Sequence, residues 1–201
     1  GSLKGMAHPP SVVHHALLRW YKTQGGKPSV ETDKIGLVKD RRLWRKRAPG
    51  NTCLSSLAQS GHFGDVAKNN SKGCGSIMRA APWAVMDINS LWREYVLDAS
   101  ALTHGHITGK LAAAAWTEMI YAVADGKDLE TVASDTAERY KRIEHGRETE
   151  EAIWKALKAP RDGRPETVEA LGGGWIAEEA LSIALYACLV AQAFAEAMAI
   201  A

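Results

Sequence analysis

Residues 108–123, TGKLAAAAWTEMIYAV, decide the fold class of this chain. Their apolar side chains recur every four residues, at Leu111, Ala115, Met119 and Val123. This spacing places the side chains on one face of an α-helix, and Thr108 can serve as the N-cap of that helix. The small residues at 112–115 allow a neighbouring helix to approach closely. The stretch therefore predicts a long helix that packs tightly against others.

The helical period continues on both sides of this stretch. We predict further helices over residues 12–20, 39–47, 54–58, 77–86, 91–102, 129–143, 148–157 and 180–191. Pro82 should bend the helix in which it lies. No segment alternates apolar and polar residues for long enough to form a strand. We therefore expect an all-α fold, with residues 3–201 forming a single helical domain.

Composition limits the class of partner. The chain has 25 Lys and Arg against 23 Asp and Glu, a formal net charge of +2, and the two signs alternate along the sequence. The densest basic stretch, residues 39–47, is interrupted by an acid and two large apolar residues. We interpret it as a solvated amphipathic face, although it could steer a phosphate-bearing ligand. Nucleic acid is not an expected partner.

Cysteine use and hydropathy favour a cytoplasmic protein. Cys53, Cys74 and Cys188 are odd in number and form no CxxC pair, which argues against a disulfide framework and against a structural zinc site. The most apolar run, residues 180–191, is too short to span a bilayer, so no membrane partner is expected. Residues 1–2 resemble a tag scar.

Residues 69–76, NNSKGCGS, are the first candidate for chemistry. They lie at the end of a loop-like stretch, residues 61–75, that is long for a compact domain. Glycines let backbone N–H groups converge, and Ser71, Lys72 and Ser76 add donors, so the segment could receive an anionic group such as a phosphate. The alternative is a glycine-rich turn that leads into a helix with a serine N-cap.

Two further segments are weaker candidates. Residues 103–106, THGH, place two histidines in a loop, where they could contact a ligand or a metal or serve only as capping groups. Residues 172–180, GGGWIAEEA, place Trp175 before a helix whose first turn carries Glu178 and Glu179. Neighbouring helical residues point about 100° apart, so these two acids make a poor paired site.

Four strings, taken together, resemble the ADP-ribosylglycohydrolase family. They are RAPGNT at 47–52, NSKGCGSIMRAAP at 70–82, ALTHGH at 101–106 and GWIAEEAL at 174–181. They occur in this order and span most of the chain. The resemblance implies a compact orthogonal all-α bundle. It also implies hydrolysis, with two magnesium ions, of the glycosidic bond that joins ADP-ribose to a protein side chain or related acceptor.

The resemblance also implies ligand-binding roles for particular residues of this chain. In the family, the loop and a Thr-His segment lie against ADP-ribose. The residues of this chain that match them are Ser71, Gly73, Cys74, Gly75 and His104. The first four match the part of the loop that receives the diphosphate and ribose, and the last matches a residue near the ligand. Trp175 becomes a candidate wall of the pocket.

The family's metal ligands have no counterpart in this sequence. The resemblance places them in a Thr-Asp-Asp-type segment upstream of the matching region and in an Asp-Ser-Asp-type segment downstream, and neither string occurs here. We therefore expect a bundle truncated at both ends, with no metal cofactor, no assignable catalytic residue and no turnover by this chain alone. Two alternatives stay open. One is a non-catalytic module that binds ADP-ribose or a nucleotide, and the other is a helical scaffold that self-associates as a homo-oligomer.

Overall fold

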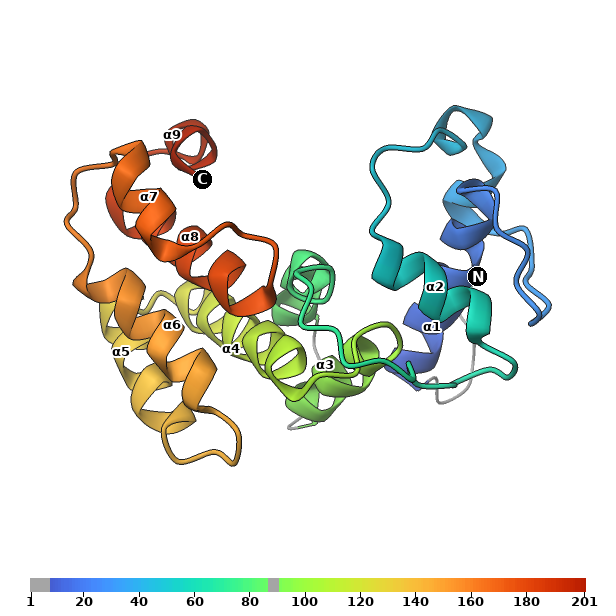
Figure 1. Ribbon diagram of the computed structural model, residues 1–201, viewed down its shortest axis with the longest axis horizontal. Helices are drawn as coiled ribbons and strands as arrows, with labels where there is room; N and C mark the ends of the chain where they lie inside the picture. Colours follow the sequence, from blue (N-terminus) through green and yellow to red (C-terminus); the bar gives the residue numbers. More distant parts are fainter. Residues whose placement is uncertain (1–7, 87–90) are drawn as a thin grey trace.

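The computed structural model describes residues 8–86 and 91–201 and shows an all-helical fold (Figure 1). The α-helices are α1 (Pro9–Thr23), α2 (Asn51–Gln59), α3 (Trp92–Ala101), α4 (Ile107–Ala124), α5 (Leu129–Tyr140), α6 (Arg147–Lys158), α7 (Pro165–Leu171), α8 (Ala177–Val190) and α9 (Phe194–Ile200). The 3₁₀ helices are η1 (Gly36–Lys39), η2 (Arg41–Leu43), η3 (Ile77–Arg79) and η4 (Ala81–Val85). The described residues contain no strand, only an isolated antiparallel bridge between Gly73 and Ile176, so the all-α prediction is confirmed. The tag-like residues 1–2 lie outside the described part.

Helix α4 is the hub of the larger group of helices. It contacts α3, α5, α6 and α8, and residues 112–115 together with Met119 have no exposed surface. The short alanine side chains let neighbouring helices approach on several sides, as the sequence predicted. The buried face ends before the helix does, because Val123 is 41% exposed.

The chain forms two groups of helices that meet at α3 (Figure 1). Helices α4 to α9 make the larger group, while α1, α2, η1 and η2 make the smaller one. Helix α3 contacts both α1 and α4 and so joins the two. The smaller group has buried side chains of its own, Leu18 of α1 and Leu57 of α2. Within the described residues, no helix is long and apolar enough to cross a lipid bilayer.

The helix predicted over residues 39–47 is wrong. The chain forms the short helices η1 and η2 there and then continues without regular structure. The side chain of Asp40 accepts hydrogen bonds from the backbone N–H and the guanidinium of Arg42, which favours a turn over a longer helix. Residues 41–48 are exposed, so the apolar members of this stretch find no core to pack against.

Three local details also differ from expectation. Residues 77–86 form η3 and η4 instead of one bent helix, and Pro82 lies in the first turn of η4, where its missing N–H costs little. Helix α7, which was not predicted, begins at Pro165, whose fixed φ suits a first helical residue. The N-cap of α4 is His106, whose Nδ1 accepts from the N–H of Thr108.

Candidate functional site

Asn69 anchors the first turn of the glycine-rich loop, residues 69–76. Its side-chain amide donates to Ser56 Oγ at 2.9 Å and to the carbonyl of Thr103 at 3.0 Å. Its side-chain oxygen accepts from the N–H groups of Ser71 and Gly105, each at 3.0 Å. One side chain therefore holds the loop against both α2 and the turn between α3 and α4. Local sequence assigned no separate role to Asn69.

The middle of the loop pairs with the segment that precedes α8. The N–H of Cys74 donates to the carbonyl of Trp175 at 3.1 Å, and the N–H of Ala177 donates to the carbonyl of Lys72 at 2.7 Å. Together with the bridge from Gly73 to Ile176, these bonds form a short clasp. Residues 72–74 and 175–177, which belong to separate candidate segments of the sequence, are thus side by side.

Lys72 lies between two carboxylates. Its Nζ contacts Glu178 at the start of α8 and lies 3.0 Å from Glu148 Oε1 in the first turn of α6. Burial tends to lower the pKa of Lys72, but its hydrogen bonds with the two carboxylates outweigh burial and raise that pKa. The hydroxyl of Thr108 donates to Glu148, and this bond, together with Lys72, lowers the pKa of Glu148. The charge of Lys72 is therefore balanced by two carboxylates within the protein.

His104 is buried beneath the loop. Burial, reinforced by the positive charge of Arg79, lowers its pKa to about 4, so the imidazole is neutral near pH 7. Its Nδ1 lies 2.8 Å from Thr103 Oγ1, and Arg79 donates to that same hydroxyl oxygen. All three groups are satisfied when Thr103 donates its proton to Nδ1, which leaves the proton of His104 on Nε2. A Cβ atom added at Gly73 would lie 3.3 Å from this Nε2, so the N–H is directed at the loop.

Arg79 supports the loop from the core side. Its guanidinium donates to the carbonyls of Gly75 and Ala99, at 2.7 and 3.0 Å, and to Thr103 Oγ1 at 2.6 Å. Burial lowers its pKa, and the sulfur of Cys53 is a neighbouring acceptor. Arg79 lies inside one of the strings that resemble the family, but its role in fixing the loop could not be derived from local sequence.

The predicted ligand-binding residues lie together in space. Ser71 Oγ accepts from the N–H of Gly73 at 3.1 Å and lies 3.1 Å from the hydroxyl of Thr52. The N–H of Cys74 is already bonded within the clasp, whereas the structure gives those of Gly75 and Ser76 no partner among the described residues. A phosphate cradle would therefore use the second half of the loop. The ligand-binding roles stay a prediction.

Trp175 lies at the outer edge of the clasp. Its side chain is 82% exposed, so it lines no closed pocket. Behind it, Glu179 accepts from the N–H of Gly173 at 3.1 Å, which fixes the turn before α8. Glu179 therefore acts as a local structural acceptor.

The acids beside the loop do not fit a pair of magnesium ions. Among residues 8–86 and 91–201, no group of three or more His, Cys, Asp or Glu side chains is arranged to hold a metal ion. Glu148 and Glu178 converge, but the ammonium of Lys72 lies between them. One oxygen of Glu178 is buried without a hydrogen-bond partner and could serve as a metal ligand. A single oxygen is not enough, because magnesium needs a near-octahedral set of oxygens. No metal-dependent step can be assigned to these residues.

The fold and the site define an all-helical protein in which a glycine-rich loop is fastened between helix termini, above a buried neutral histidine. The chain belongs to the ADP-ribosylglycohydrolase family, whose model matches residues 2–201. No curated protein and no solved structure gives a significant match. The resemblance noted from four short strings is therefore confirmed over nearly the whole sequence.

Proposed function

We propose that the chain binds ADP-ribose, free or attached to a protein side chain, through residues 73–76. The observation that carries the proposal is the convergence of the family-matched residues above His104. The N–H groups of Gly75 and Ser76 can donate to a phosphate oxygen, and the N–H at Nε2 of His104 adds a neutral donor from below. Lys72 positions the loop through its carboxylate partners and does not bind the phosphate.

The binding test uses isothermal titration calorimetry with ADP-ribose. Gly73→Val should abolish binding, because a branched side chain beside His104 Nε2 and Ser71 Oγ would block the approach of the phosphate. Gly75→Val should do the same, although an added Cβ would lie only 2.9 Å from His104 Cε1 and would also disturb packing. Gly61→Val is the matched control, since a Cβ there would contact only the Asp65 carboxylate, at 3.7 Å. Equal affinity in all four proteins contradicts the proposal.

The family reaction is hydrolysis of the glycosidic bond to ADP-ribose, and we propose that this chain alone does not carry it out. Magnesium would supply water activation and charge stabilisation to such a reaction. The carboxylates nearest the loop are instead paired with Lys72 and Thr108. Release of ADP-ribose from ADP-ribosyl-arginine, ADP-ribosyl-serine or O-acetyl-ADP-ribose should stay at background with and without magnesium. Chelator-sensitive release by the purified chain would refute this.

Self-association is a second candidate property, and one surface favours it. Phe194 and Met198 lie one turn apart on α9 and are 82% and 63% exposed. Apolar side chains exposed in this way are commonly covered in an oligomer. Sedimentation velocity should show concentration-dependent association that Phe194→Ser weakens. A monomer at every concentration contradicts it.

A further inference from the structure

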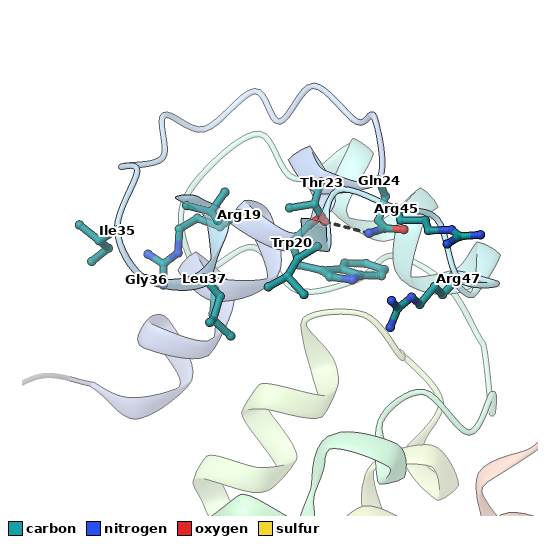
Figure 2. A pocket seen from close by; sticks show the side chains of 12 residues that line it. Arg19, Trp20, Thr23, Gln24, Ile35, Gly36, Leu37, Arg45 and Arg47 are labelled. Carbon is teal, nitrogen blue, oxygen red and sulfur yellow. Dashed lines mark hydrogen bonds between the residues drawn. The ribbon is translucent and has the colours of Figure 1, made fainter. Parts of the chain in front are cut away.

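A cavity lies in the smaller helix group, between α1 and the segment of residues 35–47 (Figure 2). Its volume is about 480 Å³, within the range of small-molecule sites. None of residues 69–76 lines it, so it is separate from the loop that carries the proposed ADP-ribose site.

The inner surface of the cavity is apolar and aromatic. The indole of Trp20, on α1, forms one side, and Figure 2 shows it facing the open space. Leu37 and Leu43 line the cavity from the opposite segment and are 78% and 42% exposed. Large apolar side chains left accessible around a concave space can be covered by a flat apolar ligand.

The charged lining of the cavity is entirely positive among the described residues. Its charged members are Arg19, Arg45 and Arg47, and no acidic side chain lines it. Arg19 is neutralised by Asp33 at 2.9 Å. Arg45 and Arg47 have no carboxylate partner in the described part of the chain. Figure 2 shows the guanidinium of Arg47 directed back toward the Trp20 indole.

Local contacts hold the walls of the cavity in place. The indole N–H of Trp44 donates to the carbonyl of Val38 at 2.9 Å and closes the loop that carries the apolar wall. On α1, the amide of Gln24 donates to Thr23 Oγ1 at 2.8 Å, and that hydroxyl donates to the carbonyl of Trp20 at 2.7 Å. A cavity formed before binding needs little ordering when a ligand enters.

We propose that this cavity binds a small aromatic anion. Its ring lies against Trp20 and the leucines, and its phosphate or carboxylate binds Arg47 and Arg45. An arginine fork recognises both anions in the same bidentate way, and the flat ring matches the apolar lining. The site belongs to the segment whose basic residues the sequence analysis assigned mainly to a solvated face.

The test is calorimetric titration with 1-naphthyl phosphate, compared with inorganic phosphate and with 1-naphthol. We expect saturable binding of naphthyl phosphate and at least about tenfold weaker binding of either half, because each half lacks one of the two interactions. Binding of inorganic phosphate as tight as that of naphthyl phosphate, or no binding of naphthyl phosphate at millimolar concentration, overturns the proposal.

Variants locate the site. Arg47→Gln should weaken naphthyl phosphate binding about tenfold, and the Arg45→Gln, Arg47→Gln double variant should weaken it further. Both residues are exposed, so the fold should be unchanged by circular dichroism. Arg142→Gln, an exposed arginine outside the cavity, is the control and should leave affinity unchanged.

A loop variant separates this site from the proposed ADP-ribose site. Gly73→Val should abolish ADP-ribose binding and leave naphthyl phosphate binding intact. If naphthyl phosphate binding is lost with Gly73→Val and kept in the arginine double variant, the aromatic anion binds at the loop and this inference fails. If ADP-ribose does not bind the wild type but naphthyl phosphate does, the proposed function fails and this inference stands.

Discussion

The glycine-rich loop at residues 69–76 and the basic segment at residues 35–47, which forms only the short helices η1 and η2, are held in opposite ways. The loop is bonded to α2, to the turn before α4 and to the start of α8, all distant in sequence. The basic segment is closed mainly by its own neighbours, through Trp44 with Val38 and Arg42 with Asp40. The comparison shows that a glycine-rich, polar sequence can be partly buried and tied to several other elements, while a basic, partly apolar one stays at the surface. Substitutions should therefore be costly in the first region and cheap in the second.

The largest effect is expected at Gly105, under the loop. A Cβ there would lie 1.8 Å from the carbonyl oxygen of Asn69, so Gly105→Ala must displace backbone. We expect a loss of about 3 kcal/mol in the free energy of unfolding, measured with urea. Gly109→Ala is the matched control, because its nearest contact would be 3.5 Å and alanine favours a helix. An equal loss of unfolding free energy in Gly105→Ala and Gly109→Ala would contradict the view that the backbone contact at Gly105 makes substitution costly.

The second largest effect is expected from acid, which should lower the free energy of unfolding through His104 beneath the loop. Unfolded His104 binds a proton near pH 6.5, whereas the folded protein resists protonation down to about pH 4. The unfolded state therefore gains the proton first, and the free energy of unfolding falls as the pH drops through this window. The loss from this histidine should reach about 2–3 kcal/mol at pH 4. His104→Gln should flatten the pH dependence, and the exposed His62→Gln should not; an unchanged slope in His104→Gln contradicts the assignment.

Removing the cation between the two carboxylates should have a moderate effect. Lys72→Met leaves Glu178, whose side chain is only 12% exposed, without its partner. We expect a loss of about 1–2 kcal/mol in the free energy of unfolding at pH 7. Arg147→Met breaks an exposed pair with Glu151 and should leave the free energy of unfolding almost unchanged. Similar losses in both variants would show that the Lys72 cluster is an ordinary surface contact.

The smallest effect is expected in the basic segment. Leu37→Ser replaces a side chain that is 78% exposed and should change the free energy of unfolding by less than about 0.5 kcal/mol. The buried Leu57→Ala, in α2, should cost about 2–4 kcal/mol in the same assay. A cost for Leu37→Ser close to that of Leu57→Ala would mean that the segment packs far more tightly than its exposure indicates.

Local sequence predicted those parts of the molecule in which periodicity and burial coincide. Residues 108–123 show a helical period and become the buried α4, and the loop composition of residues 61–75 predicted their lack of helix. Residues 39–47 show a similar period, but residues 41–47 remain exposed and no continuous helix forms. A repeat indicates which residues share a face, and only the fold decides whether that face is covered.

The candidate site was predictable as a set of residues but not as an arrangement. The resemblance to the family selected Ser71 and Gly75 together with His104, and the structure brings them together. The pairing of Lys72 with Glu148 and Glu178 joins three distant segments, and no local pattern encodes it. For the same reason, local sequence suggested that Lys72 donates a hydrogen bond to a phosphate, whereas in the structure its ammonium pairs with Glu148 and Glu178.

The clasp between residues 72–74 and 175–177 has a consequence for the order of folding. Contacts between distant segments form late, because the intervening chain must first be ordered. During synthesis residues 72–74 leave the ribosome long before residues 175–177 have been made, so the clasp cannot form until the later segment is present. The loop should therefore acquire amide hydrogen-exchange protection last, in the same kinetic phase as the N–H of Ala177, which donates to it. The proposed ligand site would then be completed only when residues 175–177 have docked against the loop.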